Sequence, residues 1–262
     1  MSPTRRNESR RTPHLPPKGP ADLWGEIVDL AWARVQDGVN SCHTCKNEPC
    51  FEVGNLPPGR PWNPQWRGRL VLISEAPPRG GGFWHLGRQG DRLRQTLLRL
   101  LRDKGLPVPA DADGQDALQA FLDWDFFLMQ ALKWPLAEGK GFHQLGASEQ
   151  RRLVEHAADH TYEELRVLAP RGILAMGGAA WQVCRKVSGS PERLPEGGVE
   201  AIRGTDYALV LRPGRTAPAN TEPIPLNVTF LPVDQNLRVP EREQAIRGDL
   251  EAFLERHEWR FR

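Results

Sequence analysis

Apolar and polar residues follow two patterns along this chain: short apolar runs, and longer stretches with helical spacing. The apolar runs are rich in β-branched and aromatic residues, which is typical of strands buried in a sheet. We expect strands at 70–73, 124–130, 172–176, 207–211 and 226–231. The first of them, Leu70-Val71-Leu72-Ile73, contains no polar residue and therefore reads as a fully buried strand.

Stretches with apolar residues three and four positions apart predict helices between these strands. After the first strand, Asp91-Arg92-Leu93 opens a helix in which leucines recur on one face. The expected helices span 21–35, 91–101, 115–122, 148–168, 179–187 and 240–256. Strands that alternate with helices, without an internal repeat, predict one α/β domain with three α/β/α layers around a central, mainly parallel sheet.

The 262 residues are enough for one sizeable core, and the net charge is only +2. We see no apolar run long enough for a membrane span and no secretory signal, so we expect a cytoplasmic protein that does not bind membranes. Residues 1–19 are basic and rich in proline, which predicts a disordered tail before a single domain at 20–262. Such a tail could contact a polyanion, or it could be solvated without a partner.

Candidate chemistry gathers after the first strand. Glu75 stands at the strand's end, Gly80–Gly82 form a glycine-rich loop, and Phe83, Trp84 and Arg88 follow. In open α/β sheets ligands bind where strands end, and helix N-termini there attract phosphates. The sequence therefore predicts a binding site here, and the alternative is a tight crossover loop with a solvated Glu75.

Three cysteines form a second candidate site. Cys42 and Cys45 have C-x2-C spacing, which can present two thiolates to one metal, and Cys50 could be a third ligand. A fourth ligand would have to come from His43, Cys184 or a histidine of a distant helix. The competing interpretation is three free thiols, and Cys184 itself is expected to be a buried core residue.

Taken in order, several segments resemble motifs of the uracil-DNA glycosylase superfamily, most closely of the family-4 enzymes that carry an iron–sulfur cluster. Ser74-Glu75-Ala76-Pro77 is similar to the family's Gly-Glu-Ala-Pro-Gly, and Gly87-Arg88-Gln89-Gly90 to its Gly-Arg-Ala-Gly. Ala131-Leu132-Lys133 is similar to the end of the family's Asn-Val-Val-Lys strand. The segment 168–180 is similar to the family's Pro-x-x-Ile-x-x-Leu-Gly-x-x-Ala segment. The resemblance covers about residues 42–254.

This resemblance implies a uracil-DNA glycosylase-like fold and a DNA-repair enzyme. Such an enzyme flips uracil or another damaged base out of DNA and hydrolyses its N-glycosidic bond. The implied catalytic residue is Glu75, which matches the family's carboxylate, and Asp234, among the polar residues directly after Leu231-Pro232-Val233, is a second candidate. The implied base-binding residues are Phe83, Trp84, His85, Gln130, Gln235 and Asn236. The implied DNA-binding residues are Arg79, Arg88, Lys133 and Arg238, and we expect a monomer whose partner is DNA.

Two departures from the family change these expectations. The late His-Pro-Ser motif, whose histidine stabilises the leaving base, appears here as Leu231-Pro232-Val233, and Gln130 replaces the asparagine that reads the base. Losing one such donor typically costs about 10²–10³ in rate. A superfamily member that binds DNA or a nucleobase without cleavage is therefore the second hypothesis. The third is a different α/β enzyme that uses Gly80–Gly82 to bind a nucleotide's phosphate.

The family's cluster is also incomplete in this chain. Two of its four thiolates correspond to Cys42 and Cys45, but the other two fall at Trp134 and near Ala157. Cys50, together with His156 or His160, could replace the missing ligands around an iron–sulfur cluster or zinc.

Overall fold

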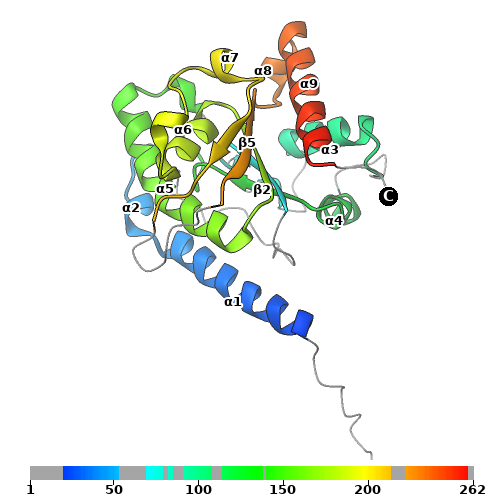
Figure 1. Ribbon diagram of the computed structural model, residues 1–262. Coiled ribbons are helices and arrows are strands. Elements are labelled where there is room, and N and C mark those ends of the chain that lie inside the picture. Colours follow the sequence, from blue (N-terminus) through cyan, green and yellow to red (C-terminus); the bar gives the residue numbers. More distant parts are fainter. Residues whose placement is uncertain are drawn as a thin grey trace, which may run out of the picture.

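The computed structural model describes residues 20–52, 69–78, 82–84, 91–107, 114–137, 140–213 and 222–258, with side chains from residue 30 onward. The predicted tail at 1–19 lies outside these residues. The protein is α/β, with a central five-stranded sheet. Figure 1 shows helices α5 and α6 on one side of the sheet and α3, α4 and α9 on the other, which agrees with three α/β/α layers.

The strands are β1 (Leu70–Ser74), β2 (Phe126–Gln130), β3 (Gly172–Met176), β4 (Tyr207–Leu209) and β5 (Ile224–Thr229). Their order in the sheet is β2-β1-β3-β5-β4. β4 is antiparallel to β5, and all other pairs are parallel. All five of these strands were predicted, and none of their ends differs from the predicted end by more than two residues.

β1 is buried along its whole length because it has a parallel partner on both sides and helices on both faces. This explains why its sequence is continuously apolar rather than alternating. β2 begins two residues later than predicted, because α4 runs on to Asp123 and Asp125 then adopts a positive φ of 67° in the turn between them.

All helices of nine or more residues in the described ranges were predicted. Their ends lie within two residues of the predicted ends, except that the first helix continues six residues beyond its predicted end. These helices are α1 (Pro20–Ser41), α3 (Arg92–Asp103), α4 (Gln115–Asp123), α5 (Ala147–Leu168), α6 (Gly178–Val187) and α9 (Pro240–Arg256). Asp91 caps α3 by accepting a hydrogen bond from the Arg94 N–H at 2.8 Å. At the start of α5, the Glu149 carboxylate accepts the Gly146 N–H at 2.8 Å, which explains why the helix begins there.

Three helices of four residues each were not predicted: α2 (His43–Lys46), α7 (Val199–Ile202) and α8 (Asp234–Leu237). A single turn carries no hydrophobic periodicity, so the sequence pattern cannot reveal it. Two of these turns matter below, because α2 carries one of the cysteines and α8 begins at Asp234.

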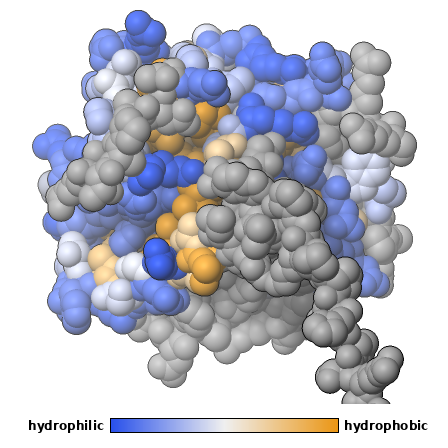
Figure 2. All heavy atoms as spheres, turned by 60° about the horizontal axis from the view of Figure 1, so that its bottom comes forward, coloured by the Kyte–Doolittle hydropathy of each residue, from blue (hydrophilic) through white to orange (hydrophobic). Residues whose placement is uncertain are grey.

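On the face in Figure 2, most of the described surface is hydrophilic, and apolar side chains form a narrow band in the middle of the view. Leu30 is the one large apolar side chain recorded as exposed in the described part of the chain. None of the helices in the described ranges combines the length and the apolar character that crossing a bilayer requires.

The strand order also determines where a ligand site is expected. From β1 the chain crosses to β2 on one side, whereas β3 lies on the other side of β1. A crevice forms at such a reversal, outside the carboxyl ends of the strands, and ligands of open α/β sheets bind there. In this protein, Ser74-Glu75 and Met176-Gly177 end the two strands that flank the reversal.

Candidate functional site

A cavity of about 610 Å³ lies at this carboxyl edge of the sheet. Its walls come from the loops after β1, β2 and β5 and from the start of α3. The lining residues are Ser74, Glu75, Ala76, Pro77, Pro78, Asp91, Arg92, Leu93, Pro135, Leu136, Lys140, Leu231 and Val233. Its volume falls within the range of small-molecule sites. The cavity therefore lies where the strand order predicts a ligand.

Glu75 is one of two carboxylates that line this cavity; the other, Asp91, caps α3. Its backbone oxygen accepts the Leu132 N–H at 2.8 Å, and its Oε1 accepts the Phe142 N–H at 2.8 Å. Burial raises the pKa of Glu75, and this effect is only partly opposed by the Phe142 N–H and the nearby His143. Glu75 is thus a fixed, half-buried carboxyl group that keeps its proton to higher pH than an ordinary glutamate.

Glu75→Gln is expected to raise the melting temperature at pH 8. The amide keeps an oxygen for the Phe142 N–H and removes a charge that burial disfavours. A carboxyl group whose folded pKa is raised destabilises the fold when both states are ionised, and this penalty disappears in acid. The gain should therefore shrink as the pH falls through the raised pKa and vanish below about 4.5, the ordinary glutamate value.

Thermal unfolding at pH 8, 6 and 4 checks this expectation. Each kcal/mol gained in the free energy of unfolding should raise the melting temperature by roughly 2–4 °C. The exposed Glu200 provides the control, since Glu200→Gln should leave the melting temperature nearly unchanged at every pH. A lower melting temperature for Glu75→Gln at pH 8 would mean that the carboxylate stabilises the fold.

The residues after β5 form the opposite wall. Leu231 and Val233 line the cavity, and Asp234 accepts a hydrogen bond from Arg92 Nη1 at 2.8 Å, which connects α8 to the start of α3. Asn236 donates to the Leu231 carbonyl at 2.9 Å and accepts from Arg242, so its amide orders the loop. Gln235 is exposed and does not line the cavity.

Phe83 and Trp84 are core residues, which corrects the prediction that one of them stacks on a base. Both side chains are 0% exposed. They pack edge-on against each other at 5.0 Å between ring centroids, and both contact Phe121 of α4. Trp84 Nε1 donates to the Leu128 carbonyl of β2 at 2.9 Å. Neither ring presents a face to a ligand in this structure.

Gln130 and Lys133 are also buried. Gln130 pairs in register with Ser74 at the carboxyl end of the strands but does not line the cavity. Lys133 is 0% exposed, and its Nζ donates to the Gln130 carbonyl at 2.6 Å and to Glu164 at 2.7 Å. The prediction that Lys133 contacts DNA is therefore wrong for this structure, because its charge lies within the core.

Of the other predicted DNA-binding and base-binding residues, one lies on the surface and three lie outside the described residues. Arg238 is exposed at the end of α8, where it can meet a polyanion. Arg79, His85 and Arg88 lie outside the described residues. Two further basic residues line the cavity: Arg92, the first residue of α3, and Lys140, which follows β2.

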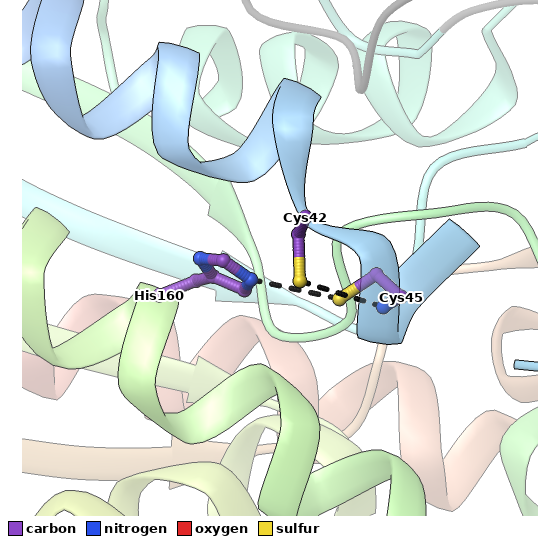
Figure 3. Close-up of side chains that lie close together, drawn as sticks. All are labelled: Cys42, Cys45 and His160. Atoms are coloured by element: carbon purple, nitrogen blue, oxygen red, sulfur yellow. Dashed lines mark hydrogen bonds between the residues drawn. The ribbon is translucent and has the colours of Figure 1, made fainter. Parts of the chain in front are cut away.

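The second candidate site lies where the cysteine segment, residues 42–50, packs against α5. Cys42 Sγ, Cys45 Sγ and one ring nitrogen of His160 all lie within 4.8 Å of one another, and Cys45 Sγ is 3.5 Å from His160 Nε2 (Figure 3). Cys42 lies between α1 and α2 and caps α2, Cys45 belongs to α2, and His160 belongs to α5. They are the residues best placed to hold a metal.

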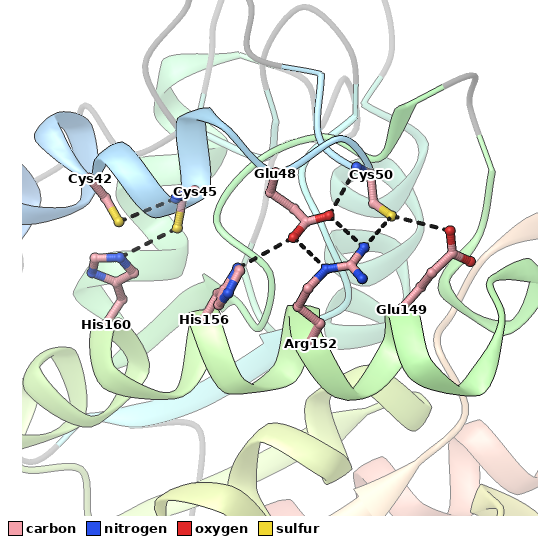
Figure 4. A network of polar contacts seen from close by, with 8 residues as sticks. All are labelled: Cys42, Cys45, Glu48, Cys50, Glu149, Arg152, His156 and His160. Carbon is pink, nitrogen blue, oxygen red and sulfur yellow. Dashed lines mark hydrogen bonds and ion pairs between the residues drawn. The ribbon is translucent and has the colours of Figure 1, made fainter.

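Cys50 and His156 do not join this cluster. Cys50 Sγ donates to Glu149 Oε1 at 3.6 Å and accepts from Arg152 at 3.5 Å (Figure 4). His156 lies 3.5 Å from Glu48, which also forms a two-pronged ion pair with Arg152. That pairing lowers the pKa of Glu48. The expectation that Cys50 is a metal ligand is therefore corrected.

Cys184 is fully buried in α6, as expected, and burial raises the pKa of its thiol to about 12. Such a thiol is inert and packs as a small apolar residue.

A comparison with models of protein families finds no match for this chain, and a comparison with curated proteins finds none either. The functional argument therefore depends on the chemistry of the two sites themselves.

Proposed function

We propose that this protein binds a nucleobase of DNA in the cavity beside Glu75 and hydrolyses the N-glycosidic bond of uracil or another damaged base. The observation that carries the proposal is the position of Glu75. It is a half-buried carboxyl group at the end of the central strand β1, in a cavity at the point where the strand order reverses. The motif resemblance around Glu75 supports the same reading, including a uracil-DNA glycosylase-like fold.

The chemistry of the reaction gives Glu75 a defined task. When the N-glycosidic bond breaks, positive charge develops on the sugar and negative charge on the departing base. An ionised Glu75 can stabilise the sugar's charge or orient the attacking water. The N–H of Phe142 holds the carboxylate in place, and a preorganised charge of this kind acts without reorganisation during the reaction.

DNA must reach this cavity through its rim. Arg92, Lys140 and the nearby Arg238 bring positive charge to the same edge of the sheet. Phosphate contacts with such residues release counterions, so binding through them should weaken steeply with salt. Arg92 already pairs with Asp234, and a phosphate would compete with that carboxylate.

One observation favours binding without cleavage as a second candidate. Leu231 stands where the resembled motif has its histidine, and this leucine lines the cavity. Its Cβ lies 3.3 Å from where a Cβ on Gly177 would stand, which places it between the ends of β5 and β3. An apolar side chain at this place cannot donate a hydrogen bond to a departing base.

Single-turnover base release separates the two candidates. Labelled oligonucleotides with uracil, hypoxanthine, xanthine or a G·T mismatch are incubated with the wild type, Glu75→Gln and Leu231→His. If the protein is a glycosylase, Glu75→Gln should slow release by about 10²–10³ or more, and Leu231→His should accelerate it by up to a similar factor. Leu231→Met is the control that keeps the cavity apolar and should leave the rate unchanged.

If neither the wild type nor Leu231→His releases any base while DNA still binds at low salt, the binding protein is the correct reading. Absence of DNA binding at low salt would overturn both candidates.

A further inference from the structure

Four side chains on successive turns of α5 face the segment 42–50: Glu149, Arg152, His156 and His160 (Figure 4). Residues three or four apart share one face of a helix, so a single face of α5 meets the whole segment. Three of the four pair with Glu48 or Cys50. His160, at the end of the row, meets the two cysteines of the C-x2-C motif instead.

We propose that Cys42, Cys45 and His160 bind one zinc ion, with water as the fourth ligand. This inference does not depend on the proposed function. In a tetrahedral zinc site, metal–ligand distances of about 2.3 Å to sulfur and 2.0–2.1 Å to nitrogen separate the ligand atoms by roughly 3.5–3.8 Å. The Cys45 Sγ to His160 Nε2 distance of 3.5 Å already has this value, and all three ligand atoms lie within 4.8 Å.

The donor set selects the type of metal. Two thiolates and an imidazole favour zinc, whereas magnesium and calcium prefer oxygen ligands. Within the described ranges, no further cysteine, histidine or carboxylate belongs to the cluster. The stretch at 53–68, which follows the cysteine segment, contains none of these residue types. Cys42 and His160 are both partly exposed, so water can reach the fourth position.

An iron–sulfur cluster does not fit these residues. Such clusters are held by four cysteine thiolates, or in Rieske centres by two cysteines and two histidines, and the described cluster offers three ligands. In a four-iron cluster each thiolate binds a different iron atom, so the sulfurs must stand further apart than ligands of a single ion do. Here only two thiols meet, they share their site with an imidazole, and Cys50 is engaged by Arg152 and Glu149. The site therefore departs from the cluster that the resemblance implies.

Bound zinc would fasten the cysteine segment to α5, across a sequence separation of 115 residues. The same segment continues to Cys50 and Glu52. Their backbones bond at 2.8 Å to Ala137 and Pro135, in the loop that supplies one wall of the cavity. The ion would thus stabilise the position of that wall without touching the cavity itself.

Metal analysis of the untagged full-length chain tests the proposal. After dialysis against metal-free buffer, elemental analysis should find about one zinc per chain and neither iron nor acid-labile sulfide. Exchange with Co²⁺ should give the visible absorption bands of a four-coordinate ion and a near-ultraviolet thiolate charge-transfer band. The thiolate band should have the intensity of two thiolates, which tests the ligand set in the wild-type chain without relying on any variant.

Matched variants locate the ligands. Cys42→Ser and His160→Gln should weaken zinc binding by more than the roughly 10–100-fold that follows loss of a ligand's hydrogen-bond partner. Cys50→Ser and His156→Gln change the same residue types on the same two segments and should keep the metal. Stoichiometric iron with sulfide would overturn the proposal, as would a wild-type chain that binds neither zinc nor cobalt. So would loss of the metal in Cys50→Ser with retention in His160→Gln.

Discussion

Lys133→Met is expected to lower the free energy of unfolding by about 3–5 kcal/mol. Lys133 and Glu164 are both 0% exposed, and their charged atoms are 2.7 Å apart. Removing the ammonium leaves a carboxylate in the core without its countercharge, which costs much more than the net value of the pair. The loss should be largest at high pH, because the variant must then bury an ionised Glu164 without the lysine's opposite charge. Urea denaturation at pH 6 and pH 8.5 measures both effects.

The double variant Lys133→Met/Glu164→Leu is the control for this experiment. It removes both charges together, and replacing a buried pair by apolar side chains is often neutral or stabilising. We therefore expect it to recover most of the loss. If Lys133→Met alone costs less than about 1 kcal/mol, the pair is solvated and the lysine is available for other contacts. In that case the proposed DNA binding should also depend less on salt in the variant, with the slope of log K against log salt reduced by about one.

Trp84→Ala should be equally damaging, at about 3–5 kcal/mol, because it empties the space of one of the two tryptophans that are fully buried in the described core. It also leaves the Leu128 carbonyl without the indole donor. Trp84→Phe fills most of the space and removes mainly the hydrogen bond, so it should cost much less, about 1–2 kcal/mol. Denaturant unfolding of both variants gives these values.

If Trp84 instead stacks on a base, the opposite result is expected. A ring that stacks on a flipped base contributes about 1–3 kcal/mol to binding and little to stability. If Trp84→Ala folds with nearly wild-type stability and binds single-stranded DNA more weakly, Trp84 is a binding residue that opens from the core. Equal affinity of Trp84→Phe and wild type for DNA, with reduced stability, would agree with the packing seen here.

The sheet was predictable for a physical reason. The central strands β1 and β3 are buried on both faces, so burial itself imposes a continuous apolar run that the sequence displays. The position of Glu75 followed from the same signal, because a polar residue directly after such a run must lie at the carboxyl edge. The four-residue helices left no comparable signal.

Burial of single side chains was much less predictable. Aromatic residues beside glycines look like a loop open to ligands, and only the packing of α4 against Phe83 and Trp84 shows that they are core. Lys133 is similar, because its partner Glu164 lies 31 residues away. His156 and His160 are one turn apart on the same face of α5, so the sequence could not decide which of them meets the thiols.

Trp84 also has a consequence for self-association. β2 and β4 are the outer strands in the order of the sheet, and an outer strand with free backbone groups is a template for adding another chain. The indole of Trp84 occupies the Leu128 carbonyl on β2, and β4 is only three residues long. Both edges are therefore poor templates for intermolecular β-pairing, and the indole of Trp84 hinders the addition of another chain along β2.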